Sequence, residues 1–391
     1  MTIPFLSTNS TNDAATKSGV SSPGGLKVVV LEGSPYDRGV IHGRMLKKEI
    51  NEVIRKWKTQ IEAGYKIDAD EFILRFIKET DFIPAIRKWT PDLLEEVKGI
   101  AEGAGVDFTT MLFFQFPDEE WANAPSIAAG HCSSMGIDKR GDRPAVIAQN
   151  MDIGGFYDGY QTLLCIKRKD SDLESFVFTC AGLIALNGMN NRSVGVTVNT
   201  LSQLSHSRDS LPVSFVIRGI LERETLKDAV KFLHTVKHAS GQNYILGGPE
   251  EVFSFECSAN RISPYVPFKN AHIVYHTNHP LANDDYSDEY RTWLVTHDRS
   301  EIQKSDTGVR FQSLEKRLKG NLDALDVDDF QSALRSTDSE KNPICVPYRN
   351  ASETFTFGST IMILSKKPEI WITAGPPDSK EYMAFAFSPG S

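Results

Sequence analysis

The sequence of 391 residues has no run of about 18 consecutive apolar residues, the length that a membrane-spanning helix needs. It also lacks the two common nucleotide-binding signatures, G-x-x-x-x-G-K-[ST] and a strand followed by G-x-G-x-x-G. Lys and Arg together number 43 against 51 for Asp and Glu, and the net charge of −8 argues against nucleic acid as a partner. We therefore expect no membrane, nucleic-acid or nucleotide-cofactor partner.

Cysteine is scarce, with five residues and no C-x-x-C pair, so no disulfide framework is expected. Free thiols suit a reducing compartment, and the expected location is cytoplasmic. Residues 1–25 are rich in Ser, Thr, Asn and Gly and lack the apolar centre of a secretory signal. We expect these residues to form a flexible tail.

Helical and strand patterns occupy different parts of the chain. Residues 34–115 are mainly helical, with an N-cap and a proline at Ser34-Pro35 and a glycine stop at Gly105. Gly39 and Gly43 lie on one helical face, a spacing typical of close packing against another element. After residue 130 most segments are strands separated by turns. The pattern predicts an α+β fold with mostly antiparallel sheets.

Three histidines near position 275 have a spacing that would suit zinc on a helix, namely His272, His276 and His279. The residues between them are β-formers, so His272 and His276 share a strand face while His279 points the other way. An H-E-x-x-H motif is also absent. The sequence therefore predicts no metal site.

One cysteine differs from the other four in its surroundings. Four lie in apolar segments that suit buried packing: Cys165, Cys180, Cys257 and Cys345. Cys132 lies instead in the small and polar segment Gly130-His131-Cys132-Ser133-Ser134, where the helical part gives way to the strands. A thiol at such a junction can be activated as a nucleophile.

Several ordered motifs together resemble those of the isopenicillin-N acyltransferase (acyl-coenzyme A:6-aminopenicillanic acid acyltransferase) family. The resemblance covers roughly Leu26 to the C-terminus. Its motifs are the segment around Cys132, the turn Lys139–Asp142, the strand Ala148–Asp152, the hairpin from Asn187 to Asn199, Tyr275–His279 and Trp371–Pro377.

The resemblance implies an N-terminal nucleophile hydrolase fold, in which two antiparallel sheets lie between helical layers. It also implies a precursor that cuts itself between His131 and Cys132. The products would be a helical pre-segment, residues 26–131 after the tail, and a catalytic chain, residues 132–391. The new α-amine, with an ordinary pKa of about 7.7–8.0, would take the proton of its own thiol. An acyl-enzyme would then release its acyl group to water or to an amine.

The resemblance also assigns roles to other residues. Asp152 would orient the nucleophile, with a turn residue at the strand end as the alternative. Asn278 would donate a hydrogen bond to the oxyanion, unless it merely ends a strand. Asn199 and Arg310 are candidate supports of the substrate or oxyanion, although for Arg310 a solvated helix arginine is the favoured interpretation. No resident cofactor is implied, and acyl-coenzyme A enters only as a possible donor substrate.

The chain departs from the family at His131, where the relatives usually carry glycine. Cleavage is therefore expected to be slow, or assisted by the imidazole. Two other functions stay open. One is a papain-like Cys-His-Asn hydrolase, disfavoured because Ser133 replaces an aromatic residue after the nucleophile, and the other is a non-catalytic binding scaffold. The expected partners are a small acyl amide or amine and the cleaved N-terminal fragment.

Overall fold

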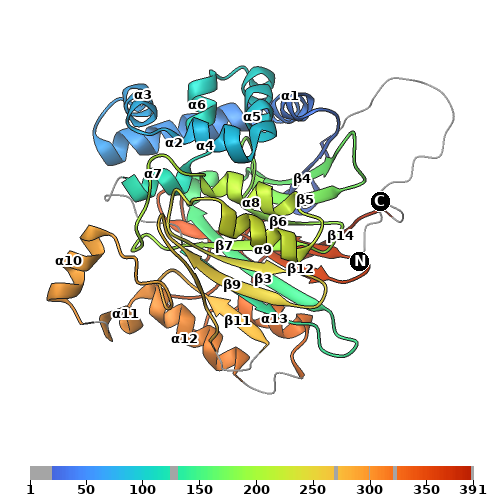
Figure 1. Ribbon diagram of the computed structural model, residues 1–391, viewed down its shortest axis with the longest axis vertical. Coiled ribbons are helices and arrows are strands. Elements are labelled where there is room, and N and C mark those ends of the chain that lie inside the picture. Colours follow the sequence, from blue (N-terminus) through green and yellow to red (C-terminus); the bar gives the residue numbers. More distant parts are fainter. Residues whose placement is uncertain (1–19, 124–130, 268–271, 299, 320–323, 389–391) are drawn as a thin grey trace.

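A computed structural model describes residues 20–123, 131–267, 272–298, 300–319 and 324–388. Two sheets lie face to face between two helical layers, as Figure 1 shows. The fold is thus the α+β sandwich expected of an N-terminal nucleophile hydrolase. Of the expected tail, residues 1–19 lie outside the described part, while Pro23–Gly25 form a 3-10 turn.

The pre-segment supplies most of one helical layer. Its strand β1 (Lys27–Leu31) is followed by helices α1 (Pro35–Met45), α2 (Lys47–Tyr65), α3 (Ala69–Glu79), α4 (Phe82–Trp89), α5 (Pro91–Ala104), α6 (Phe108–Phe113) and α7 (Pro117–Asn123). The expected helix signals are confirmed, because Ser34 and Asp37 form a capping box and Gly105 ends α5 with φ of 72°.

The first sheet consists, in spatial order, of β1, β4 (Gln161–Lys167), β5 (Glu174–Cys180), β6 (Asn187–Asn190), β7 (Gly195–Thr200), β8 (Gln242–Gly247), β9 (Val252–Cys257) and β10 (Ile262–Pro264). Its strands pair antiparallel except β1 and β4, which are parallel. Helices α8 (Val213–Leu221) and α9 (Leu226–Thr235) pack on this sheet beneath the pre-segment (Figure 1).

The second sheet has the order β11 (Ile273–His276), β2 (His131–Ile137), β3 (Ala145–Gly154), β12 (Thr354–Leu364), β13 (Glu369–Thr373) and β14 (Met383–Ala386). Its outer face carries α12 (Asp306–Leu318) and α13 (Val327–Leu334), with α10 (Asp288–Thr296) and α11 (Ser300–Lys304) beside them (Figure 1). Side chains alternate along β2, so Cys132 faces the first sheet whereas Met135 and Ile137 pack toward α12 and α13.

Helices α1 and α5 lie in direct backbone contact. A Cβ atom placed on Gly39 would lie 2.0 Å from the carbonyl oxygen of Glu96, and one on Gly99 would lie 2.2 Å from that of Tyr36. The packing role predicted for Gly39 and Gly43 is confirmed. Glu96 also forms buried ion pairs with Arg38 of α1 and Arg218 of α8, which join the pre-segment to the later part of the chain.

Candidate active site

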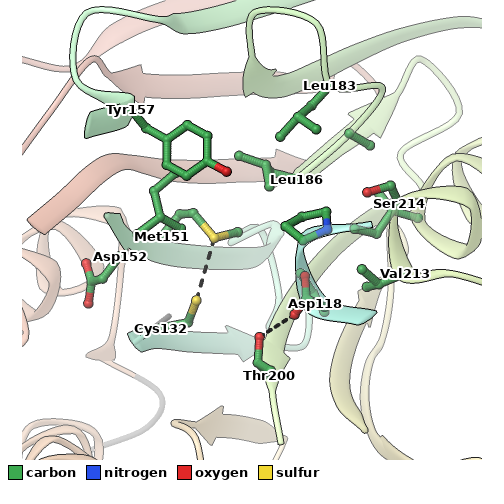
Figure 2. Close-up of a pocket in the computed structure, with 15 residues that line it drawn as sticks. Asp118, Cys132, Met151, Asp152, Tyr157, Leu183, Leu186, Thr200, Val213 and Ser214 are labelled. Carbon is green, nitrogen blue, oxygen red and sulfur yellow. Dashed lines mark hydrogen bonds between the residues drawn. The ribbon is translucent and has the colours of Figure 1, made fainter. Parts of the chain in front are cut away.

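Cys132 is the second residue of β2 and pairs with Met151 of β3. Its side chain is buried, and its Sγ lies 3.6 Å from the Sδ of Met151. The thiol lines a small, mainly apolar pocket of about 30 Å³ between the sheets, shown in Figure 2. The other lining residues are Pro117, Asp118, Met151, Asp152, Ile153, Tyr157, Leu183, Ala185, Leu186, Val198, Thr200, Val213, Ser214 and Ile217.

The backbone of Cys132 is held by two side chains from later in the sequence. Its N–H donates to Oδ1 of Asn278 at 2.8 Å, and its carbonyl oxygen accepts from Nη1 of Arg310 at 2.7 Å. The Nη2 of Arg310 also donates to Oδ1 of Asn278, at 3.0 Å. The structure thus brings together three of the residues predicted from the sequence, over separations of 146 and 178 residues.

Arg310 corrects the interpretation favoured from the sequence, which placed it in solvent. Its side chain is fully buried, because this face of α12 packs against β2 and β11. Besides Cys132 and Asn278 it contacts Asp306, whose Oδ2 accepts from Nε at 3.0 Å and from Nη2 at 2.7 Å. Arg310 is therefore a buried, fully paired cation.

Asp152 lies inside β3, directly opposite His131 of β2, rather than in the following turn. Its Oδ1 accepts from Oγ1 of Thr356 at 2.6 Å, while its Oδ2 is buried and has no partner among the described residues. Burial raises the pKa of Asp152 to about 7, although the nearby Arg310 cation opposes that shift. The carboxyl group can therefore exchange a proton near neutral pH.

The thiol itself is poorly ionised in the intact chain. Burial, followed by the negative charge of Asp152, raises the pKa of Cys132 to about 12. The backbone N–H of Asp152 and the Arg310 cation act in the opposite direction but are weaker. A thiolate at this position needs a nearby base or a change in its surroundings.

Asn199 lies on β7 and is buried between the sheets. Its Oδ1 accepts from the hydroxyl of Ser134, and its Nδ2 donates to the carbonyl oxygen of His276 at 3.4 Å. Asn199 is absent from the residues that line the Cys132 pocket. Asn199 therefore lies outside the Cys132 pocket and contacts β2, the strand that carries Cys132.

Asp118 of α7 also reaches the pocket, which sequence reasoning missed. Its Oδ1 accepts from Oγ1 of Thr200 at 2.5 Å, a bond drawn in Figure 2, and from Nε2 of Gln242 at 2.9 Å. In the sequence Asp118 starts an acidic run after a proline, which is typical of a solvated first helical turn. No local signal distinguishes it from such a residue.

A second and larger pocket, of about 550 Å³, lies beside the first, and Thr200 lines both. Its other lining residues are His131, Ser202, Gln203, Asn278, His279, Tyr290, Trp293, Glu301, Ile302, Ser305, Asp306 and Thr307. The two residues of the expected cleavage site thus line different pockets, because neighbouring side chains on a strand point to opposite faces.

The three histidines considered for zinc have separate partners. His272 bonds Asp138, His276 bonds Glu256 and His279 bonds Thr307. In the part of the chain that the structure describes, no group of three His, Cys, Asp or Glu side chains is arranged to hold a metal ion. Within the same part, no helix combines the length and apolarity that crossing a membrane requires.

The two sheets stacked between helical layers form an α+β sandwich of the N-terminal nucleophile hydrolase-like fold. The chain belongs to the acyl-coenzyme A:6-aminopenicillanic acid acyl-transferase family, whose model matches residues 139–379. Cys132 lies shortly before the first matched residue. Its role therefore depends on the geometry of the site rather than on the family match.

Two proteins of Dictyostelium discoideum are similar in sequence. Protein dcd1B is 25% identical over 240 residues, which are 56% of this chain and 47% of that protein. Protein dcd1A is 29% identical over 109 residues, which are 24% of this chain and 25% of that protein. The matches thus span about half or less of these relatives.

Solved structures that are similar to this chain share little sequence identity with it. A Caenorhabditis elegans N-acylethanolamine-hydrolyzing acid amidase ortholog matches with a TM-score of 0.41 and 17% identity, covering 66% of this chain and all of that chain (100%). A variant of conjugated bile acid hydrolase from Clostridium perfringens matches with a TM-score of 0.44 and 12% identity, covering 66% of this chain and 97% of that chain. These scores are too low to assign a function.

Proposed function

We propose that this protein is an autoprocessing cysteine amidohydrolase or acyltransferase. It first cuts its own chain between His131 and Cys132, and it then acts on a small acyl amide through an acyl-enzyme on the new N-terminal Cys132. The observation that carries the proposal is the position of Cys132, with its thiol in an apolar pocket and its backbone held by Asn278 and Arg310.

The need for a base supports the processing step. A thiol with a pKa of about 12 is a weak nucleophile at neutral pH, and cleavage would create an α-amine on the same residue. Asp152 lies opposite His131, so the new amine would form next to a carboxyl group whose Oδ2 has no partner among the described residues. Asp152 would then hold the amine in place.

Asn278 is the proposed oxyanion donor. Its Nδ2 donates one hydrogen bond to the carbonyl oxygen of Thr200 at 3.0 Å, and a carboxamide nitrogen carries a second N–H. This N–H would stabilise the negative oxygen that forms when the thiolate attacks a carbonyl carbon. The amine then leaves with a proton, and water or another amine takes the acyl group from sulfur.

The lining of the Cys132 pocket favours a compact acyl group of mostly apolar character. Met151, Leu186 and Val198 offer hydrocarbon or thioether surface around the thiol. Pro117 and Asp118 belong to the pre-segment and complete the same pocket. We therefore propose that the cleaved fragment stays bound and remains part of the site.

Neither of the two rival functions has a comparable basis in the described residues. A papain-like mechanism needs a histidine base at the thiol, but His276 and His279 bond Glu256 and Thr307 instead. A pure binding scaffold gives no reason for a buried carboxyl group beside the thiol-bearing strand.

Intact mass spectrometry of the purified protein tests the proposal. We expect fragments of 131 and 391 − 131 = 260 residues. Cys132→Ala should abolish both cleavage and amide turnover, because one sulfur serves both. The matched control is Cys165→Ala, since that thiol is equally buried, at 3% exposure. An uncut chain of 391 residues that hydrolyses an amide would refute the processing mechanism.

A further inference from the structure

The residue before Cys132 has a specific partner. The Nδ1 of His131 lies 2.7 Å from the Oδ2 of Asp306, the first residue of α12, and both side chains line the larger pocket. The contact is made by the imidazole itself, so a glycine at position 131 would lose it.

The same carboxylate also accepts hydrogen bonds from Arg310, the arginine that donates to the Cys132 backbone. Asp306 Oδ2 accepts from Nε and Nη2 of Arg310, and Nη1 of Arg310 donates to the carbonyl oxygen of Cys132. The His131 side chain and the Cys132 backbone, which flank the 131–132 peptide bond, thus both bind the Asp306–Arg310 pair. The peptide unit between them has little freedom to move.

The pairing of Asp306 is also electrostatically favoured. Burial alone would raise the pKa of its carboxyl group, but the hydrogen bond from His131 and the Arg310 cation hold it well below its usual range. Asp306 is therefore a charged acceptor, and hydrogen bonds to charged acceptors are short and strong.

The direction of the imidazole limits what it can do. His131 and Cys132 are neighbours on β2, so their side chains point to opposite faces of the sheet. His131 faces Asp306 and the larger pocket, while the thiol lies in the apolar pocket. The imidazole is therefore placed to fix residue 131 in position rather than to take the proton of the thiol.

We propose that His131 and Asp306 are positioning residues for self-cleavage, a role that rests on the proposed autoprocessing. The pair holds the carbonyl carbon of residue 131 within reach of Cys132 Sγ. Sulfur then bonds to that carbon, the bond to the Cys132 nitrogen breaks, and the thiol proton ends on this nitrogen. Water cleaves the thioester, restores the thiol and leaves a carboxylate on His131. Afterwards His131 belongs to the small fragment and touches no reacting atom.

The test compares cleavage rates of three variants after a pulse of cell-free synthesis. We expect His131→Gly to cleave about 10–100-fold more slowly than wild type, since loss of orientation in a near-attack geometry costs rate on this scale. His131→Asn should recover part of the rate, because its Nδ2 can donate to Asp306 much as Nδ1 does.

His272→Gly is the matched control. It removes a pair of the same kind, His272 Nδ1 to Asp138 Oδ2 at 2.7 Å, from a place that lines neither pocket. We expect its cleavage rate to equal that of wild type. Thermal unfolding of each variant, made uncleavable by Cys132→Ala, shows whether stability follows the rate.

The outcomes separate the two proposals. If His131→Gly cleaves as fast as wild type or faster, the positioning role is wrong and autoprocessing stands. If His272→Gly slows cleavage equally, the effect is general destabilisation and the positioning role is again wrong. If wild type never cleaves, autoprocessing itself fails, and the positioning role fails with it.

Discussion

Replacing Arg310 by methionine tests how much the interactions around Cys132 contribute to stability. The guanidinium group makes hydrogen bonds to Asp306, Asn278, Ser133 and the Cys132 carbonyl oxygen, and it is fully buried. Methionine fills a similar volume but donates nothing. The carbonyl oxygen of Cys132 would then lack its charged donor, and Asp306 would keep only His131.

The size of the effect follows from the exposure of the two charges. Breaking a fully buried ion pair by removing one partner costs about 3–5 kcal/mol. The Asp306 side chain is 32% exposed, so water recovers part of that loss. We therefore expect the free energy of unfolding to fall by about 2–4 kcal/mol, between the values for buried and surface pairs.

Urea unfolding in a Cys132→Ala background measures this change on uncut chains. The matched control is Arg317→Met on the same helix, where the arginine is 32% exposed and pairs with Asp338 at 3.1 Å. Such a surface pair is worth about 0–1 kcal/mol. Equal unfolding midpoints for the two variants would refute the reasoning that Arg310 is a buried structural cation. In the chain with its thiol intact, Arg310→Met should also slow self-cleavage.

Two further changes have defined outcomes. In the cleaved enzyme Asn278→Ala should lower kcat by about 10²–10³-fold with little change in KM, because the lost hydrogen bond strengthens as charge develops on oxygen. A near-normal kcat combined with a lower melting temperature would show that Asn278 has no role in catalysis. Burial, together with the negative charge of Asp118, raises the pKa of Glu119 from 4.5 to about 8. The contribution of the Glu119 carboxyl group to stability is therefore complete below about pH 4.5 and is lost as the pH rises to about 8. Glu119→Gln should therefore gain stability relative to wild type across this range in urea unfolding, and a difference that is constant with pH would contradict the shift.

The local features of this protein could be predicted from its sequence. The capping box at Ser34 and the left-handed glycine at Gly105 depend on residues within one helical turn, so the helix ends they mark were predicted correctly. The change from helices to strands near Cys132 marked the start of a central strand, and the ordered motifs indicated the family. The glycine pair in α1 likewise indicates a close contact, although no local signal identifies α5 as the partner helix.

The surroundings of Cys132 depended on the tertiary structure. Arg310 resembles a surface residue because its helix is amphipathic by local pattern, and only the packing of α12 on β2 buries it. Asp118 and Asp306 meet Thr200 and His131 across 82 and 175 residues. The parallel pairing of β1 with β4 likewise has no signal in the local sequence. Local sequence determines backbone preference and the polarity of each face, whereas contacts over such separations depend on the register of the sheets and the packing of helices on them.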